Sequence, residues 1–333
     1  MTDRPNPAAP IIAPLPDDAA RPAWSVMIPT YDAGGYLRDT LASVLAQALP
    51  PAAMQIEVVD DASTRDDPAR VVDEVGGGRI ALHRQPRNVG AIANFNTCVT
   101  RARGRYVHIL HADDLVRPGF YTALGDALAR HPAAGAAFCR CAAIDAQDRE
   151  TWLSELERPD AGMLDDFLPR IAVSSRIQTP TIVVRRAVYE ALGGYDPRLF
   201  HTADWEMWQR IAAHHPIWYE PRPLACYRQH AASDTARLER TAANVANVRA
   251  AIAIAAAYLP PHLAATLRRQ ALLHSADKAL WRTKELRAAG DADAALAQLR
   301  AAITCLRDAG LYRRALRLQV TAIAQWLRGR AHA

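Results

Sequence analysis

Lysine is nearly absent from this chain of 333 residues. Lys278 and Lys284 are the only two, so arginine carries almost all of the positive charge. Arginine suits phosphate and carboxylate recognition because its planar fork donates two parallel hydrogen bonds. The formal net charge of +5 is modest, and no single basic helix is rich in aromatic residues that would stack on bases. The composition therefore does not indicate a nucleic-acid partner.

Cysteine is also scarce, and its five thiols are odd in number. Cys139 and Cys141 have the spacing of residues that share one face of a strand, but no second pair completes a zinc site. We expect buried free thiols in a reducing compartment. The first residues lack a basic segment followed by an apolar core, and no uncharged apolar run approaches the roughly 20 residues that span a bilayer. These absences predict a cytoplasmic protein.

The glycine-rich loops that cradle phosphates are absent as well. No G-x-G-x-x-G follows the first apolar run, and G-x-x-x-x-G-K-[ST] occurs nowhere. Gly76 to Gly78 stand between a predicted helix and a predicted strand, which is the wrong context for such a loop. Any bound phosphate must therefore be held mainly by something other than a glycine loop and a lysine.

The middle of the chain alternates between apolar runs and segments with helical periodicity. This alternation predicts an α/β fold with a mostly parallel central sheet flanked by helices. The predicted strands are residues 24–28, 54–61, 79–84, 105–110 and 135–145. We divide the chain into a flexible Pro-rich tail at 1–22, an α/β domain at 23–235 and an α-helical C-terminal subdomain at 236–333.

Polar clusters follow three of the predicted strands. The first strand ends at Pro29-Thr30-Tyr31, the second at Asp60-Asp61 and the fourth at His111 to Asp114. Open parallel sheets bind ligands beyond the carboxyl ends of their strands. The adjacent carboxylates of Asp113 and Asp114 are costly to hold together, because like charges repel and each loses hydration. Oxygen ligands suit Mg²⁺ or Mn²⁺, so this pair predicts a metal that bridges a nucleotide diphosphate.

Four segments together resemble the successive motifs of family 2 glycosyltransferases. They are "SVMIPTYDAGGYLRDTLASVLAQ", "IEVVDDAST", "RNVGAIANFNTCVTRARGRYVHILHADDLVRPG" and "GGYDPRLFHTADWEMWQRIA". The resemblance covers roughly residues 24–230. It implies inverting enzymes with the GT-A fold that use nucleotide-sugar donors, with Mn²⁺ or Mg²⁺ as cofactor. We favour a UDP-sugar as donor and a saccharide or lipid-linked acceptor.

The resemblance assigns a first group of residues to the nucleotide: Pro29, Thr30, Tyr31, Asp61, Asn88, Gly90, His111, Ala112, Asp113 and Arg228. In the family Asp61 contacts the base or ribose, and Gly90 lets the backbone approach the nucleotide. Asp60 is expected to cap a turn instead. For Asn88, a structural role at the start of a helix is as well supported as a contact with the nucleotide.

His111-Ala112-Asp113 occupies the family's D-x-D position, with His111 in place of the first carboxylate. The resemblance gives Asp113 the direct metal contact and leaves His111 to bond ribose or ligate weakly. Asp114 is a further metal candidate, or it caps the segment before Pro118. In "YRQHAAS" the resemblance makes His230 a metal ligand and Arg228 a pyrophosphate contact.

The resemblance places the catalytic base at Asp204 in "HTADWEMW". Inverting transfer is one in-line displacement, in which a carboxylate accepts the proton of the acceptor hydroxyl. The plain alternative is a helix N-cap, a position that Asp often fills. Ala203 stands where the family often has Glu. Trp205 and Trp208 are expected in the core rather than under a sugar.

Two other classes remain open. A sugar nucleotidyltransferase would bring an early Gly-rich loop and a lysine, and neither is here. A non-catalytic nucleotide-sugar-binding module would not need Asp204. The resemblance favours a role in cell-surface polysaccharide, lipopolysaccharide or glycolipid synthesis. The helical stripe of residues 311–330 either contacts an anionic membrane surface or packs on the rest of the protein.

Overall fold

The computed structural model describes residues 6–16, 21–33, 35–230 and 234–318. The chain divides into two compact units. The first consists of residues 1–167 and 176–230, and the second of residues 168–175 and 231–333. The boundary at 230/231 lies close to the expected one at 235/236. The inclusion of 168–175 in the second unit was not expected.

The first unit is built on a ten-stranded sheet with the order β3-β2-β1-β4-β9-β6-β10-β5. Its described strands are β1 (Trp24–Thr30), β2 (Met54–Asp60), β3 (Ala81–Arg84), β4 (Tyr106–Ile109), β5 (Leu115–Val116), β6 (Ala136–Ile144), β7 (Glu150–Leu153), β8 (Gly162–Met163), β9 (Ile182–Arg185) and β10 (Ile217–Arg228). β7 pairs with β6, and β8 pairs with β10.

The sheet is parallel in its first half and mixed in its second. Strands β3, β2, β1 and β4 are all parallel, as expected. β9 then runs antiparallel to both β4 and β6, while β6 and β10 are parallel. The apolar stretches "IWYE" and "LACYR" belong to one strand, β10, whose pairing with β6 shifts around Pro223. Proline lacks the N–H that a regular ladder needs, so an irregularity there is expected.

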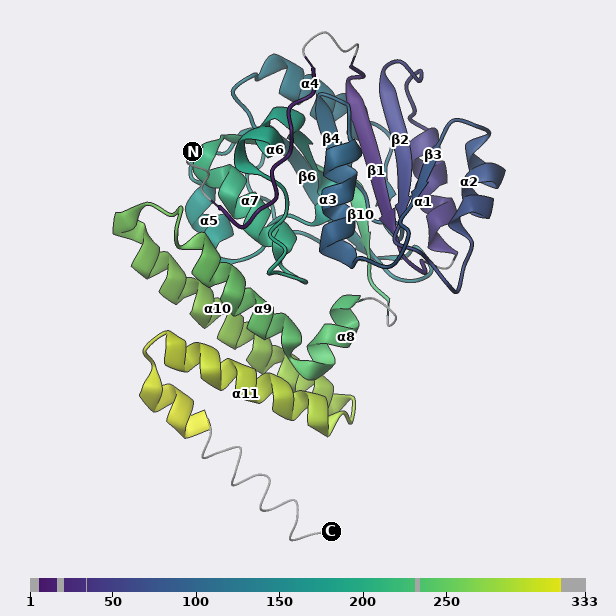
Figure 1. Cartoon of the computed structure of the whole chain (residues 1–333). Coiled ribbons are helices and arrows are strands. Elements are labelled where there is room, and N and C mark those ends of the chain that lie inside the picture. Colours follow the sequence, from purple (N-terminus) through teal and green to yellow (C-terminus); the bar gives the residue numbers. More distant parts are fainter. Residues whose placement is uncertain (1–5, 17–20, 34, 231–233, 319–333) are drawn as a thin grey trace. The chain divides into compact units, whose positions relative to one another are not determined.

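Helices cover both faces of the sheet. The unit contains α1 (Tyr36–Leu45), α2 (Pro68–Gly76), α3 (Ala91–Arg101), α4 (Phe120–Arg130), the 3-10 helix η1 (Thr179–Thr181), α6 (Arg186–Leu192) and α7 (Ala203–His214). α1, α2 and α4 pack on the face that carries Val26 and Ile28. α3 lies in front of the strands in Figure 1. All seven residues of β1 are buried, because both of its faces are covered.

Residues 6–16 form what we call the N-terminal strap. Asn6, Ala9 and Ile12 are buried, and Figure 1 shows the segment in dark purple beside α6 and α7. The expectation of a flexible tail is therefore wrong for residues 6–16. The prolines there shape an extended segment whose polar groups bond to the rest of the unit: Pro10 accepts from Gly194, and Ala13 accepts from Arg186.

The second unit is helical, as expected. It holds α8 (Asp234–Thr241), α9 (Ala243–Ala255), α10 (Pro261–Ala288), α11 (Ala292–Asp308) and most of α5 (Phe167–Val173). α10 begins at Pro261, where the missing N–H leaves no helical bond unmade. Small residues such as Ala276, Ala279 and Ala302 form its core. Of the stripe expected at 311–330, only residues up to 318 are described, and Leu316 is exposed.

Within the described ranges, every helix is too short or too polar to cross a membrane.

Candidate active site

The carboxyl ends of β1 and β2 lie side by side, as the sequence predicted. Thr30 pairs with Asp60 in the sheet register, and the N–H of Asp61 donates to the carbonyl of Thr30 at 2.9 Å. Pro29 is buried within β1, and Tyr31 just beyond it is 47% exposed. The hydroxyl of Thr30 is buried and has no hydrogen-bond partner in the described structure. An unpaired buried hydroxyl at a strand end is a polar group that a ligand could satisfy.

Asp60 caps a turn, which confirms the prediction for this residue. Its Oδ1 accepts from the backbone N–H of Ser63 at 2.9 Å and from the Ser63 hydroxyl at 2.6 Å. The side chain is fully buried. Asp60 therefore holds the loop after β2, and its Oδ2 lies 3.4 Å from Arg84 Nε.

Asp61 joins the loop after β2 to the start of α3. Its two carboxylate oxygens accept from the N–H groups of Val89 at 2.7 Å and Gly90 at 2.9 Å. Asn88 Oδ1 also accepts from Gly90, at 3.1 Å. Gly90 has φ 89, a conformation that glycine adopts without strain, and it is the N-cap of α3. Burial raises the pKa of Asp61 despite these hydrogen bonds. Asp61, Asn88 and Gly90 thus meet in one place.

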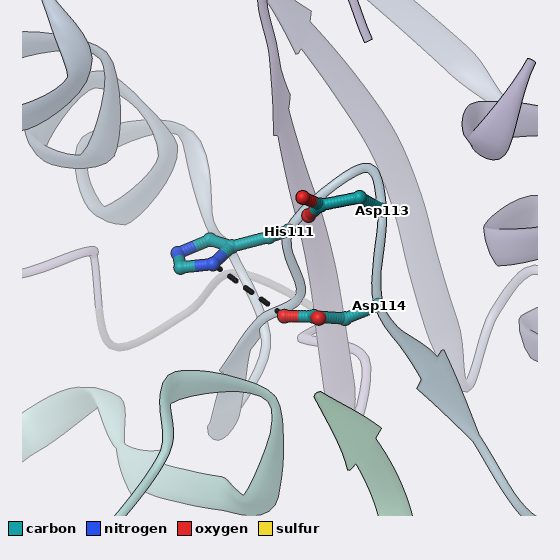
Figure 2. A group of neighbouring side chains, drawn as sticks. All are labelled: His111, Asp113 and Asp114. Carbon is teal, nitrogen blue, oxygen red and sulfur yellow. Dashed lines mark ion pairs between the residues drawn. The ribbon is translucent and has the colours of Figure 1, made fainter. Parts of the chain in front are cut away.

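His111, Asp113 and Asp114 come together on the loop that follows β4 (Figure 2). Each offers one ligand atom, and these atoms all lie within 4.8 Å of one another. The loop is fixed to α1, because the hydroxyl of Thr40 lies 2.9 Å from the carbonyl of Ala112 and 2.8 Å from that of Asp114. Ala112, within the loop, is buried. The cluster is therefore held by the backbone as well as by its own contacts.

The charges in this cluster act strongly on one another. Burial and the neighbouring charge of Asp113 raise the pKa of Asp114 to about 6. Burial would also raise the pKa of Asp113, but the hydrogen bond from His230 and the charge of His111 lower it overall. Burial would lower the pKa of His111, but Asp114, Asp113 and Asp204 raise it overall. The histidine thus stands among three carboxylates that favour its charged form.

The end of β10 brings Arg228 and His230 to the same loop. Arg228 is buried, and its backbone N–H donates to Asp114 Oδ1 at 2.9 Å while its Nε donates to the carbonyl of Asp113 at 2.7 Å. His230 Nε2 lies 3.1 Å from Asp113 Oδ2. The guanidinium also stacks over the Tyr36 ring, 4.6 Å from its centroid. The two residues predicted from "YRQHAAS" are therefore in contact with the two predicted carboxylates.

Asp204 opens α7 but does not cap it. The N-cap is Thr202, and Asp204 is the second residue of the helix, so the plain N-cap alternative is wrong. Its Oδ2 accepts from the Thr179 hydroxyl at 3.2 Å, and its Oδ1 accepts from the N–H of Trp205 at 2.7 Å. Trp205 and Trp208 are buried in the core, as predicted.

The sequence did not indicate several contacts made by the site residues. The ring of Phe95 stacks on His111 with centroids 5.2 Å apart, Tyr36 stacks under Arg228, and Thr179 holds Asp204. Phe95 is an apolar residue of α3, a type common on packed helix faces, so nothing in its identity indicates a site. Thr179 lies where no motif was evident. These residues are placed by tertiary contacts that a single sequence does not encode locally.

The cluster fits a divalent cation of the Mn²⁺ or Mg²⁺ kind. Two carboxylates and an imidazole converge, with a second imidazole, His230, bonded to one of the carboxylates. Over the described residues, His111 Nε2, Asp114 Oδ2 and Arg228 Nη2 are buried atoms without a hydrogen-bond partner. Buried polar atoms are normally satisfied, so these atoms are available to a cation and to an anionic ligand.

Comparison with solved structures identifies the fold of this chain. With 16% identity, the chain superposes on residues 1–349 of S. aureus TarS in complex with UDP-GlcNAc, with a TM-score of 0.67 over 89% of this chain and 83% of the other. The mannosyltransferase PcManGT of Pyrobaculum calidifontis, in complex with GDP-Man and Mn²⁺, gives a TM-score of 0.56 at 21% identity over 98% and 84% of the two chains. The architecture is the GT-A fold.

The sequence comparisons place the chain in a family. Residues 25–192 match the family described as glycosyl transferase family 2. TuaG of Bacillus subtilis, named for a glycosyltransferase of teichuronic acid biosynthesis, is 40% identical over 99 residues, which cover 28% of this chain and 37% of TuaG. The chain belongs to glycosyl transferase family 2 and is a glycosyltransferase. The resemblance expected from the motifs is confirmed, and the two rival classes are not supported.

Proposed function

We propose that this glycosyltransferase needs a divalent cation and transfers a sugar from a nucleotide-diphosphate donor to a hydroxyl acceptor with inversion. The observation that carries the proposal is the meeting of His111, Asp113 and Asp114 with the end of β10, within reach of the charge of Asp204. A cation site and a separate carboxylate are the two elements that such a displacement requires.

The donor diphosphate is proposed to lie against the loop after β4. Asp113 and His230 would hold Mn²⁺ or Mg²⁺, with Asp114 and His111 completing the set. The ion, when bound, offsets the charge that grows on the departing diphosphate. Arg228 would also offset the charge on the diphosphate, because its Nη2 is buried and has no partner among the described residues. The other nitrogens of Arg228 bond to Asp113, Asp145 and Asp148, which keeps the guanidinium in place.

The nucleoside is proposed to occupy the adjoining ends of β1 and β2. Pro29, Thr30 and Tyr31 would line one side, with Asp61, Asn88 and Gly90 on the other. The unpaired hydroxyl of Thr30 is available to a ribose or base. Asp61 acts mainly by holding the Val89–Gly90 turn, since both of its oxygens already accept backbone hydrogen bonds. Ala112 would contribute its backbone only. We favour a UDP-sugar, the donor class bound by TarS, over the GDP-mannose bound by PcManGT.

Asp204 is proposed as the catalytic base. Its Oδ2 accepts from the Thr179 hydroxyl and its Oδ1 accepts from the N–H of Trp205, so the carboxylate is held at the start of α7. A carboxylate fixed in this way accepts the acceptor proton as the hydroxyl attacks the anomeric carbon from the face opposite the nucleotide. The product of an α-linked donor would be a β-linked sugar.

The acceptor is proposed to be a saccharide or a lipid-linked saccharide of the cell surface. TuaG, which is named for teichuronic acid biosynthesis, supports a polysaccharide pathway. A cytoplasmic location is supported by the five cysteines, all of which are buried and free of disulfides. Peripheral membrane contact through the C-terminal helices remains part of the proposal, although most of the stripe lies beyond the described residues.

A turnover panel tests the proposal. The protein is incubated with UDP-, GDP-, CMP- and dTDP-sugars, with Mn²⁺ or with EDTA, and the release of nucleotide is measured. We expect one nucleotide class to be consumed, only with metal. Asp204→Asn should slow release by about 10²- to 10⁴-fold without weakening donor binding.

The matched control is Asp73→Asn, an exposed carboxylate on α2, which should keep the wild-type rate. Equal release in EDTA would contradict the metal requirement. Full turnover in Asp204→Asn would remove the base assignment. Retention of the anomeric configuration in the product would contradict a single displacement.

A further inference from the structure

The N-terminal strap lies outside the segment that matches the family, yet its polar groups are bonded into the α/β unit. The N–H of Gly194 donates to the carbonyl of Pro10 at 2.8 Å, and Arg186 Nη2 donates to the carbonyl of Ala13 at 3.0 Å. Arg186 is the first residue of α6, and Gly194 lies just beyond its C-cap. The strap is thus attached at two points to the segment that leads into α7.

Asn6 makes the most specific of these contacts. Its Nδ2 donates to Asp196 Oδ2 at 2.8 Å and to Glu206 Oε1 at 3.2 Å. All three residues are buried, and both carboxylates are fully inaccessible. Two buried carboxylates can approach each other only when donors stand between them. The two hydrogens of one amide therefore connect the loop before α7, which carries Asp196, to the first turns of α7, which carry Glu206.

Arg210 completes the connection from the other side. Its Nη2 donates to Glu206 Oε2 at 2.8 Å and to the carbonyl of Gly194 at 2.9 Å, and its Nη1 donates to the carbonyl of Leu192 at 2.6 Å. A Cβ added at Gly194 would meet Asn96 Oδ1 at 2.3 Å and Pro10 Cγ at 3.0 Å. The strap, the loop after α6 and α7 are therefore closely packed around one polar network.

The network and the proposed base share the first turns of α7. Glu206 is two residues after Asp204 on the same helix, so a shift of the first turn of α7 moves both side chains. We propose that Asn6 is a positioning residue, which fixes the start of α7 and the preceding loop so that Asp204 meets the acceptor hydroxyl. This inference rests on the proposed role of Asp204 as base.

Loss of Asn6 should spare the fold. Glu206 keeps its buried ion pair with Arg210, and Asp196 keeps its bonds to Arg198. What disappears is the amide link between Asp196 and Glu206, while Arg210 still bonds α7 to the carbonyls of Leu192 and Gly194. Misplacement of a catalytic group by about 1 Å costs up to roughly 100-fold in rate. A purely stabilising contact would instead lower the melting temperature and leave the rate of the folded enzyme unchanged.

The test compares Asn6→Ala with wild type at a temperature where both are folded. We expect kcat for nucleotide release to fall by about 10- to 100-fold, while the KM for the donor stays within about twofold. Ile11→Ala is the matched control, because Ile11 lies on the same strap with its side chain 72% exposed. It should keep the wild-type kcat. If Asn6→Ala does not fold, Asn6→Ser, which keeps one donor, replaces it with the same expected division between kcat and KM.

A double variant separates this inference from the proposed function. If Asn6 acts through Asp204, then Asn6→Ala adds no more than about a twofold loss to Asp204→Asn, because the base is already gone. A full multiplicative loss in the double variant would overturn the positioning role, as would an unchanged kcat in Asn6→Ala. Loss of turnover in Asp204→Asn with wild-type kcat in Asn6→Ala removes this inference alone. Full turnover in Asp204→Asn removes both.

Discussion

His111 is the residue at which this chain departs most from the D-x-D pattern. Its Nδ1 lies 3.5 Å from Asp114 Oδ2, and its ring is stacked on Phe95. Its raised pKa favours an imidazolium that offsets the charge of the surrounding carboxylates before any metal arrives. Compared with an aspartate, a histidine at this position should therefore lower the affinity for metal and raise the stability of the metal-free site.

Replacing His111 by aspartate tests both expectations. In His111→Asp a positive partner is lost and a third carboxylate is added, so the metal-free protein should lose about 1–3 kcal/mol of stability. Mn²⁺ should bind about 10-fold more tightly, because the site gains an anionic oxygen ligand. Urea unfolding without metal and calorimetric titration with Mn²⁺ measure the two effects.

His111→Asn serves as the control, because it removes the charge without adding a carboxylate. It should weaken the metal-free protein less than His111→Asp does and should not tighten Mn²⁺ binding. Unchanged stability together with unchanged Mn²⁺ affinity in His111→Asp would contradict this account of the residue.

At the scale of the residue, the motifs predicted which side chains lie close together, but not the hydrogen bonds that each one makes. The contact of His230 with Asp113 and the turn capped by Asp60 follow the expectation. That both oxygens of Asp61 accept backbone hydrogen bonds does not follow from the motif. Hydrogen-bond partners depend on chain segments that are remote in sequence, so residue identity alone leaves them open.

At the scale of the element, β4 carries a buried histidine that acts on stability rather than on chemistry. His108 is fully buried, its Nε2 lies 3.0 Å from the carbonyl of Pro180, and its ring packs on Phe120. Burial lowers the pKa of His108 to about 3. Pro180 belongs to η1, the element that presents Thr179 to Asp204. His108 therefore helps to fix η1, the element that carries Thr179.

This histidine predicts a dependence of stability on pH. Its folded pKa is below its unfolded value of 6.5, so its contribution is present above pH 6.5 and is lost as the pH falls towards 3. Between pH 7.5 and pH 5.5, protonation of the unfolded chain at this one group should cost about 1.4 kcal/mol. His108→Gln should lack that part of the loss in urea unfolding.

His83→Gln on the edge strand β3 provides the comparison and should behave as wild type does. If His108→Gln and wild type lost the same stability between the two pH values, the buried neutral state of His108 would be refuted.

The elements were predictable where a strong hydrophobic period is repeated, and less so where proline intervenes. β1, β2 and α1 follow their apolar patterns, because burial on one or two faces decides them. The N-terminal strap has no such period. It is held by backbone carbonyls and by one amide side chain, and neither leaves a recognisable pattern in the sequence.

At the scale of the whole molecule, the α/β class and the helical C-terminal part could be predicted from the alternation of patterns. The antiparallel direction of β9 and the assignment of residues 168–175 to the helical unit could not be predicted in this way. Both depend on which segments pair across the fold, which local periodicity does not specify. The apolar stripe at 311–330 remains a prediction, since the described residues end at 318.

Metal-dependent binding of a nucleotide-sugar at the loop after β4 is the central prediction for this protein. Calorimetric titration of the preferred donor into the protein, with Mn²⁺ and then with EDTA, measures it most directly, with Asp113→Asn beside wild type and Asp73→Asn as control. We predict binding by wild type and Asp73→Asn only with Mn²⁺, and a loss of at least about 10-fold in Asp113→Asn. Equal donor affinity in EDTA, or wild-type affinity in Asp113→Asn, would contradict the account.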